Sequence, residues 1–402
     1  MLRRLPILLL AALAVALTAC QSAPPYNNPL PAGHFGLRRI TDPAKLPDLT
    51  GAAAQLSNAR FQRALQRSLD WYAMPSSQQH FPSGPIRHRH AWASAYALSE
   101  LAEAGPDAAL ERLRTEFDVW ESVGWDGQGS VFFTGYYTPV FRASRRPTAE
   151  YAYPLYKRPD DLVSDPVTGD VRGRKTASGV VPYPARTEIE QRNLLAGQEL
   201  VYLPSPLDAY LIHVNGSAKL ELADGGVMYV GYAGTNGRDY TSIGKLLVER
   251  GHLEEHRLSM QAIRDYFRRN PDELDRYIRQ NERFVFFREY DGSNWPAGSL
   301  GVKVTPGRSL ATDKSIFPRA CAVLVQTEAP NPAGGTMPLQ QLMLDQDTGG
   351  AIRAAGRGDI YYGIGDAAGR HAGRQAAEGK MYYLLLKPEH ARKWSERLGQ
   401  EQ

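Results

Sequence analysis

Three aspartates in the last quarter of the sequence could carry acid–base chemistry. Asp347 and Asp359 stand 12 residues apart among glycines, and Asp313 precedes them. Glycines allow a long ligand to approach the backbone closely. A carboxyl group in a groove beside Tyr361 and Tyr362 is partly removed from water, which raises its pKa and lets it remain protonated as a general acid. Alternatively, these aspartates only accept hydrogen bonds from turn backbones, so the cluster predicts a site without naming a reaction.

Other catalytic patterns are absent from the sequence or weak. There is no G-x-S-x-G nucleophile motif, no P-loop and no pair of cysteines for a metal. The glycines of Gly363–Gly369 miss the dinucleotide-binding spacing by one residue and predict a tight turn that opens a helix. His252 to His256 matches the H-x-x-E-H zinc pattern, but its charged flanks favour a solvated surface loop. We therefore expect neither a metal nor a cofactor.

The first 19 residues have the pattern of an export signal. Two arginines precede an apolar stretch from Leu5 to Leu17, and small residues then lead to Cys20. A cysteine in this position is typical of a bacterial lipoprotein, in which the Cys20 thiol is lipidated and anchors the protein. The alternative is an ordinary signal peptide. Gln21, in place of an aspartate, favours the periplasmic face of the outer membrane, and residues 20–48, rich in Pro, Gly and Asn, predict a tether.

Length and composition predict a packed core in two domains or in one large elaborated domain. The chain has 402 residues, 43% of them apolar and 22% charged, and single cores stop growing beyond about 250–300 residues. The formal charge of +4 is spread along the chain, so nucleic acid is not an expected partner. The N-terminal apolar stretch is too short for a permanent transmembrane helix, and no later stretch has 18 consecutive apolar residues. Apart from Cys20 there is only Cys321, so no internal disulfide is expected.

Hydrophobic spacing predicts helices first and mainly strands afterwards. Apolar residues at helical spacing predict helices over 61–72, 92–104 and 110–120. β-Branched and aromatic residues predict strands over 131–140, 200–203, 210–214, 219–222 and 227–231, with a turn at 223–226 between the last two. Helices are expected again over 260–267 and 271–278. Strands over 284–290, 322–326 and 382–386 complete the pattern, and residues 298–387 are expected to form a compact β-barrel.

Several short motifs, taken together, resemble the MltA family of membrane-bound lytic murein transglycosylases. They cover residues 131–387 densely in family order: Gly135-Tyr136-Tyr137-Thr138-Pro139, Tyr153-Pro154-Leu155-Tyr156, Asn215-Gly216-Ser217, Gly231-Tyr232-Ala233-Gly234-Thr235-Asn236-Gly237, Tyr240-Thr241-Ser242-Ile243-Gly244 and Asp347-Thr348-Gly349-Gly350-Ala351-Ile352. The resemblance implies a mainly β fold with N-terminal helices, in which a double-psi β-barrel domain carries a second, smaller inserted β-barrel domain across a large groove. The implied boundaries are 49–141 for the N-terminal part of the catalytic domain, 142–281 for the MltA-specific insert domain and 282–390 for the 3D catalytic domain.

The resemblance also implies a reaction and the residues that perform it. A lytic murein transglycosylase cleaves the β-1,4 bond between N-acetylmuramic acid (MurNAc) and N-acetylglucosamine (GlcNAc) in peptidoglycan without water, and leaves 1,6-anhydro-MurNAc ends. By family position Asp359 is the catalytic residue, first as acid and then as base, with Asp347 and Asp313 supporting it. The residues expected to bind the glycan strand are Tyr136, Tyr137, Thr138, Asn215, Ser217, Tyr240 and Tyr361. The implied partners are peptidoglycan glycan strands and proteins of cell-wall synthesis or degradation.

Some points remain open at the level of sequence. Where the family usually has Gln-Gly-Ser-Gly-Arg, this chain has Asn215-Gly216-Ser217-Ala218-Lys219, a departure that concerns one sugar contact rather than the fold. The tyrosines at 136, 137 and 361 could equally belong to a barrel core, since aromatic residues in strands usually do. The alternative functions are a peptidoglycan-binding lipoprotein with an inactive site and a hydrolase that leaves reducing ends.

Overall fold

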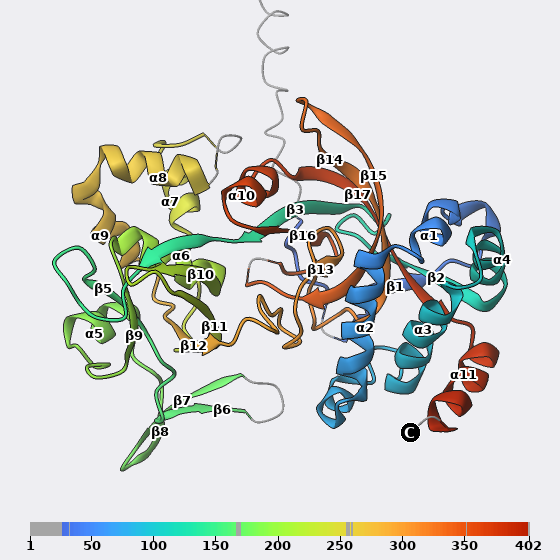
Figure 1. The fold of residues 1–402 in the computed structure, drawn as a ribbon, viewed down its shortest axis with the longest axis horizontal. Helices are drawn as coiled ribbons and strands as arrows, with labels where there is room; N and C mark the ends of the chain where they lie inside the picture. Colours follow the sequence, from blue (N-terminus) through green and yellow to red (C-terminus); the bar gives the residue numbers. More distant parts are fainter. Residues whose placement is uncertain are drawn as a thin grey trace, which may run out of the picture.

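The chain forms two bodies that are connected at strand β3. The computed structural model describes residues 26–31, 33–165, 170–254, 258, 260–350 and 352–400. Figure 1 shows that the blue and red ends of the chain make one body and that its green-to-yellow middle makes the other. Strand β3 (Val131–Thr138) belongs to the first body and leads directly into β4 (Val140–Ala143) of the second. We call these bodies the catalytic body and the insert.

Helices pack on one side of the catalytic body. They are α1 (Thr50–Gln55), α2 (Ala59–Ala73), α3 (His88–Leu101), α4 (Pro106–Glu116) and α11 (Pro388–Gln400), with short 3-10 turns η1 (Pro43–Lys45) and η2 (Pro75–His80). Asn58 caps α2 by accepting hydrogen bonds from the backbone N–H groups of Arg60 and Phe61. The apolar residues at helical spacing then bury one face of α2. The helices expected over 61–72 and 92–104 are therefore confirmed.

The third expected helix ends earlier than its spacing predicts. Helix α4 stops at Glu116, and Phe117–Ser122 form strand β2, which pairs antiparallel with β17 and with β1 (Leu37–Arg39). The expectation of a helix to residue 120 is wrong at this point. Phe117 and Val119 are buried in the alternation of a strand, so pairing with neighbouring strands overrides the helical spacing.

The catalytic body is built on an eight-stranded sheet. Its order is β1-β2-β17-β14-β15-β13-β16-β3, where the later strands are β13 (Ser309–Ala311), β14 (Ala322–Pro330), β15 (Thr336–Asp347), β16 (Arg357–Ile364) and β17 (Ala376–Leu386). Strand β3 pairs parallel with β16 and antiparallel with β17. The pairings therefore run from β17 through β14, β15, β13, β16 and β3 back to β17. Helix α10 (Asp366–Ala372) packs against β3 and β16.

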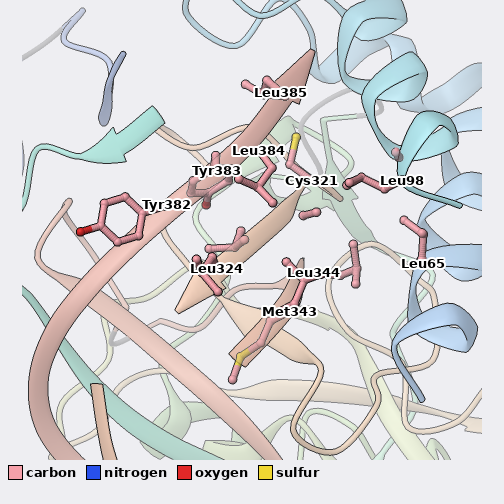
Figure 2. Close-up of a cluster of buried hydrophobic side chains, with 14 of the residues drawn as sticks. Leu65, Leu98, Cys321, Leu324, Met343, Leu344, Tyr382, Tyr383, Leu384 and Leu385 are labelled. Atoms are coloured by element: carbon pink, nitrogen blue, oxygen red, sulfur yellow. The ribbon is translucent and has the colours of Figure 1, made fainter. Parts of the chain in front are cut away.

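The core of the catalytic body lies between the helices and this sheet. Figure 2 shows Leu65 of α2 and Leu98 of α3 beside Cys321 and Leu344 from the strand region. Cys321 is a free, buried thiol. Asp345 is fully buried in the same region, where it pairs with Lys314 and accepts hydrogen bonds from the hydroxyls of Thr312 and Tyr383. A charged pair with its hydrogen bonds satisfied is therefore built into an otherwise apolar core.

The insert is made of three small sheets and short helices. Its elements are β4, β10 (Ser217–Leu222), β11 (Val227–Thr235) and β12 (Val285–Tyr290) in one sheet; β5 (Tyr153–Tyr156) with β9 (Glu199–Leu203); β6 (Leu162–Ser164), β7 (Val171–Thr176) and β8 (Gly179–Val181); and α5 (Arg186–Gln191), α6 (Pro206–Asn215), α7 (Ile243–Glu249), α8 (Met260–Arg269), η4 (Pro271–Glu273) and α9 (Leu274–Ile278). Isolated bridges join Ser144 to Tyr202 and Lys157 to Phe287. The inserted strands thus do not form one continuous sheet.

One expected strand of the insert is a helix. Residues 210–214, expected as a strand, lie in α6, which has its own core contacts. Ser205 caps this helix by accepting hydrogen bonds from the N–H groups of Leu207 and Asp208, and Pro206 occupies its first position. The run is apolar on all sides because the helix is buried, so its composition does not distinguish helix from strand. The hairpin expected at 219–231 is confirmed, with β10 and β11 antiparallel.

The segment expected to be a tether packs against the catalytic body wherever it is described. The ring of Tyr26 stacks on Phe132 at 4.4 Å between ring centres, and Leu37 lies in the core. Residues 37–39 form β1. The signal segment, Cys20 and the first residues after it lie outside the described residues. Within the described part of the chain, no helix has the length and apolar character to cross a membrane.

Candidate functional site

Strand β13 brings two of the three predicted aspartates to the same level of the sheet. Ala311 pairs with Asp347 of β15 on one side and with Asp359 of β16 on the other. Because neighbouring strands lie about 4.8 Å apart, the two aspartate backbones stand roughly 10 Å apart across β13. Asp347 and Asp359, 12 residues apart in sequence, therefore belong to the same site.

Asp359 has a half-buried carboxyl group with a single hydrogen bond to the described residues. Thr134 lies opposite it in the parallel register of β3 and β16, and the Thr134 hydroxyl donates to Oδ1 at 2.9 Å. Burial raises the pKa of Asp359 to about 6, and the negative charge of Asp347 acts in the same direction. The hydrogen bond from Thr134 and the positive charge of Arg357 lower this pKa. Asp359 can therefore hold a proton near neutral pH.

Asp347 has the opposite surroundings, because its carboxylate is surrounded by donors. The backbone N–H groups of Ser299 and Thr348 both donate to Oδ1 at 2.8 Å. The hydroxyl of Tyr136 donates to Oδ2 at 2.8 Å. The pKa of Asp347 is raised above its usual value because burial outweighs the opposite effect of these three donors and of the Lys314 charge. Both oxygens of Asp347 are occupied by the protein itself.

Asp313 holds a turn rather than facing the other two carboxyl groups. It is 5% exposed, and its Oδ1 accepts from the N–H and the hydroxyl of Ser315 at 3.0 and 2.6 Å. Its Oδ2 accepts from the N–H of Ala354 at 2.8 Å, a residue with a φ of 75°. Asp313 therefore fixes the segment that precedes β16, which is the alternative considered for a single aspartate in a turn.

Three aromatic and hydroxyl side chains line the aspartates from β3 and β16. Tyr136 and Thr138 alternate along one face of β3, and Tyr361 follows Asp359 on the same face of β16. The rings of Tyr136 and Tyr361 stand 5.0 Å apart, and the hydroxyls of Thr138 and Tyr361 are 3.0 Å apart. Tyr361 is only 1% exposed and Thr138 only 3%. Tyr361 is thus a core residue here, and its ring has no free face on which a sugar could stack.

Tyr137 points to the other face of β3, as strand alternation requires. It lies against α10, where an added Cβ on Gly369 would come within 2.8 Å of its ring. The glycine at 369 is thus needed for close packing of the helix on the strand. Tyr137 is half-buried and is not brought together with Tyr136 and the two aspartates.

The predicted residues of the insert are spread over its surface. The amide of Asn215 donates to the carbonyl of Leu211 at 2.7 Å and closes α6, after which Gly216 turns with a φ of 74°. Ser217 starts β10, which pairs in parallel with β4 and contacts β3. It therefore lies near the end of β3 that carries Thr138. Tyr240 is 36% exposed in the loop between β11 and α7.

A loop between the two bodies reaches from the insert to Asp347. The indole N–H of Trp295 donates to the carbonyl of Val230 in β11 at 3.1 Å, and its ring packs on Tyr229 at 4.6 Å. Four residues later, Ser299 donates its N–H to Asp347. The position of the insert and the environment of Asp347 thus depend on the same short segment.

Sequence reasoning did not identify Thr134, Arg357, Lys314 or Asp345. Thr134 is two residues before Tyr136, and Arg357 is two residues before Asp359. Side chains two residues apart on a strand share a face, so strand periodicity could have placed Thr134 and Arg357 on the face of the site. Lys314 and Asp345 carry no signal of their own in the sequence, because they meet only in the folded core.

Two cavities and the histidine motif lie away from the aspartates. Each cavity has a volume of about 480 Å³, one in the insert beside Arg158 and Phe287 and the other beside Asn58 and Arg308. Neither contains an aspartate of the site. His252 packs on Tyr266 at 5.2 Å, whereas Glu255 and His256 lie outside the described residues. Among the residues that are described, no group of three His, Cys, Asp or Glu side chains could hold a metal ion.

Two family models match the chain, one mainly over the insert and one over strands of the catalytic body. Residues 132–288 match the MltA specific insert domain, and residues 308–385 match the 3D domain. Asp313, Asp347 and Asp359 all fall inside the second match, and the first covers β3 and the insert except for Val131 and the last two residues of β12.

Two relatives of similar sequence are named membrane-bound lytic murein transglycosylase A. Membrane-bound lytic murein transglycosylase A of Escherichia coli K12 is 34% identical over 297 residues, which cover 73% of this chain and 75% of that protein. The Vibrio cholerae protein of the same name is 33% identical over 268 residues, or 65% and 67% of the two chains.

Solved structures agree with these sequence relatives. The membrane-bound lytic murein transglycosylase from Agrobacterium tumefaciens superposes with a TM-score of 0.72 at 29% identity, over 90% of this chain and 100% of that one. E. coli MltA with bound chitohexaose gives 0.66 at 27% identity, over 91% and 100%. Together with the two domain matches, these relatives show that the chain is an enzyme of the MltA family of membrane-bound lytic murein transglycosylases.

Proposed function

We propose that the protein cleaves the β-1,4 bond between MurNAc and GlcNAc in peptidoglycan without water and leaves 1,6-anhydro-MurNAc ends. The observation that carries this proposal is the unequal state of two carboxyl groups. Burial raises the pKa of both groups, but among the described residues Asp359 keeps one oxygen without a hydrogen-bond partner, whereas Asp347 has both oxygens bound by Tyr136, Ser299 and Thr348. Asp359 is thus the group whose proton is accessible for exchange.

The reaction needs only that single proton. Protonated Asp359 gives its proton to the glycosidic oxygen, and the bond from C1 of MurNAc to that oxygen breaks with an oxocarbenium-like transition state. The resulting carboxylate takes the proton of the C6 hydroxyl of the same MurNAc, while the C6 oxygen forms the new bond to C1. The attacking group belongs to the substrate, and such proximity is worth roughly 7–11 kcal/mol of the barrier. Asp359 ends protonated, ready for another cycle.

A hydrolase of the usual kind is less well supported. Retaining and inverting glycosidases both employ two working carboxyl groups, one as acid and one as nucleophile or base. Asp347 would be the second group, but three hydrogen-bond donors stabilise its carboxylate, which makes it a weaker nucleophile and base than a carboxylate with fewer donors. The role proposed for Asp347 is electrostatic, because its charge raises the pKa of Asp359. Asp313 supports the site only by fixing the turn before β16.

The proposed substrate path runs between the catalytic body and the insert. In this proposal residues 49–141 and 282–390 form the catalytic domain and residues 142–281 the insert domain, except that β4 from Val140 and β12 (Val285–Tyr290) belong to the insert sheet. The six strands β3 and β13–β17 have double-psi barrel topology. The strands of the insert would curve into a smaller barrel through the bridges at Ser144 and Lys157. The E. coli relative with bound chitohexaose supports a glycan ligand, for which Tyr136, Tyr137, Asn215, Ser217 and Tyr240 are the candidate contacts.

The proposed location is the periplasmic face of the outer membrane. It rests on the signal pattern and on lipidation of Cys20, and the relatives named membrane-bound support membrane attachment. Because Tyr26 is already packed on Phe132, at most five residues would separate the lipidated cysteine from the folded body. That distance is about 20 Å when fully extended, so the body would remain close to the membrane.

Mass spectrometry of reaction products tests the proposed function. Purified peptidoglycan is treated with the full-length protein in mild detergent, and in parallel with its Asp359→Asn variant. Muropeptides lighter by one water than hydrolytic products, absent with the variant, are the expected result. Hydrated reducing ends would identify a hydrolase, and no products from either protein would favour a binding protein.

A further inference from the structure

A chain of two hydrogen bonds leads from Arg357 to the acid. Arg357 stands two residues before Asp359 on β16, so both side chains lie on the same face of the strand. Nη2 of Arg357 donates to Oγ1 of Thr134 at 3.0 Å, and Oγ1 of Thr134 donates to Oδ1 of Asp359 at 2.9 Å. Thr134 is thus the only link in this chain between the guanidinium and the carboxyl group.

Chemistry fixes the direction of the first bond. A guanidinium can only donate hydrogen bonds, so Oγ1 of Thr134 must be the acceptor towards Arg357. In the second bond the Thr134 hydroxyl donates its single hydrogen to Oδ1 of Asp359. The carbonyl oxygen of a carboxylic acid is its better acceptor, so this arrangement favours a proton on the other oxygen. Oδ2, which has no hydrogen-bond partner among the described residues, is left to carry it.

We propose that Arg357 is a positioning residue that acts through Thr134: it fixes Thr134 as a donor to Oδ1 of Asp359, so that Oδ2 holds the proton that is given to the glycosidic oxygen. This inference rests on the proposed function. After the proton has left, the same two groups face a full carboxylate, which the positive charge and the hydrogen bond stabilise. The carboxylate then takes up the C6 hydroxyl proton on the same oxygen.

Arg357 is held in place by aromatic packing and not by an acidic partner. Its guanidinium lies 5.7 Å from the centre of the Phe132 ring, on whose ring Tyr26 also stacks. Nη1 contacts Oδ1 of Asn27 at 3.4 Å, and Nε is buried without a partner. Among the described residues Arg357 makes no ion pair within 4.0 Å. Its charge is therefore available to Asp359 rather than neutralised by another carboxylate.

Other charged or titratable groups around Asp359 are few and do not replace this arrangement. They are Asp347 on β15, Tyr136 on β3 and Tyr362 on β16. Asp347 acts in the opposite direction to Arg357, because a second negative charge disfavours ionisation. The tyrosines stay neutral, since burial raises their pKa values. Among the described groups that shift the pKa of Asp359, Arg357 is the one with a positive charge.

The test titrates the Asp359 carboxyl directly, so it does not depend on activity. Full-length protein labelled at the aspartate carboxyl carbons is followed by NMR in detergent, and the Asp359 signal is the one lost in Asp359→Asn. Arg357→Met and Thr134→Val are each expected to raise the Asp359 pKa by about one unit. In Arg357→Lys and Thr134→Ser, which keep the charge and the hydroxyl respectively, the Asp359 pKa is expected to stay close to its wild-type value. The double variant is expected to shift by less than the sum, because the first substitution already breaks the chain.

Rates on peptidoglycan and a matched control complete the test. Below pH 5 Asp359 is protonated in every variant, and there Thr134→Val and Arg357→Met are expected to lower the rate tenfold or more. Thr134→Ser and Arg357→Lys are expected to keep most of the wild-type rate. Arg397→Met removes another arginine that lies over an aromatic ring, at Trp394, and should change neither readout.

Three outcomes separate the inference from its rivals. Unchanged titration with lower stability in the variants would overturn it in favour of a purely structural role. Strictly additive shifts would overturn the relay and leave only a direct charge effect. Shifts as expected, but no anhydro products from the wild-type protein, would support the hydrogen-bond assignment and contradict the proposed function alone.

Discussion

Asp347 and Asp359 carry the same side chain in opposite surroundings, and that difference defines the chemistry at the scale of residues. Asp359 has one described hydrogen-bond donor, whereas Asp347 has three. Each donor favours the charged form of the carboxyl group. In the proposed function Asp347 therefore acts through its charge, and Asp359 is the group that exchanges a proton.

The activity is expected to fall as the pH rises through the pKa of Asp359. The first step requires the protonated acid, and this pKa is raised to about 6, so kcat/KM should be high below pH 6 and decline above it. Initial rates of anhydro-muropeptide release between pH 4 and 8 measure this profile. A rate that increases through pH 6 would mean that Asp359 starts the reaction as a base.

Replacing Asp359 by Asn is expected to stabilise the protein at neutral pH. The native pKa of about 6 lies above the unfolded value of 3.8. Ionisation of Asp359 therefore lowers the free energy of unfolding, beginning at about pH 4 and reaching its full effect above pH 6. The amide removes this cost, which is worth up to about 3 kcal/mol at pH 7.5 and close to nothing at pH 3.5.

Urea unfolding at those two pH values checks this prediction. Asp160→Asn changes an exposed aspartate and serves as the control with the same chemical change. A gain for Asp359→Asn that is equal at both pH values would contradict the assigned ionisation.

At the scale of elements, the alternation of β3 divides its residues between two tasks. Thr134, Tyr136 and Thr138 face the aspartates, while Tyr137 packs against α10. Gly135 lies on the α10 side as well, where an added Cβ would stand 2.8 Å from the backbone of Ala372 and from the ring of Tyr362. The close approach of α10 therefore holds the strand that presents the donors to both carboxyl groups.

Gly135→Ala is expected to destabilise the protein by about 1–3 kcal/mol and to lower activity, because the methyl group forces α10 away from β3. Thermal unfolding and product release measure the two effects. Gly350→Ala is the control, since its added Cβ meets nothing within 4 Å. Wild-type stability for Gly135→Ala would show that the helix shifts without cost.

At the scale of the whole molecule, the loop after β12 connects the insert with the acid site. Trp295 is buried against Val230 and Tyr229 of the insert, and Ser299 binds Asp347 of the catalytic body. A movement of the insert is therefore transmitted to the donors of Asp347 through four residues of chain.

Trp295→Ala is expected to lower product release on intact peptidoglycan at least tenfold, because both the indole hydrogen bond and the ring contact with the insert are lost. Trp295→Phe keeps the ring and should retain most of the rate. Small-angle scattering of both variants measures whether the two bodies separate. An unchanged profile and rate for Trp295→Ala would contradict a coupling role of the loop.

The sequence by itself indicated the family, several of the helices and strands, and three candidate aspartates. Motifs such as Gly135-Tyr136-Tyr137-Thr138-Pro139 are read directly because local spacing carries them. Helical periodicity found α2 and α3 for the same reason. Local signals were ambiguous where burial was complete, as in α6, or where strand pairing overrode helical spacing, as at Phe117.

Only the tertiary structure decided the partners of each aspartate. Asp313 accepts from Ala354, Asp347 from Tyr136 and Asp359 from Thr134, all far away in sequence, and the roles proposed for the three aspartates rest on these partners. Tyr361, open to either role in the sequence, became core because β3 covers it. Hydrogen bonds and burial set a carboxyl pKa, and both depend on strand register across more than 200 residues of chain, which no local pattern encodes.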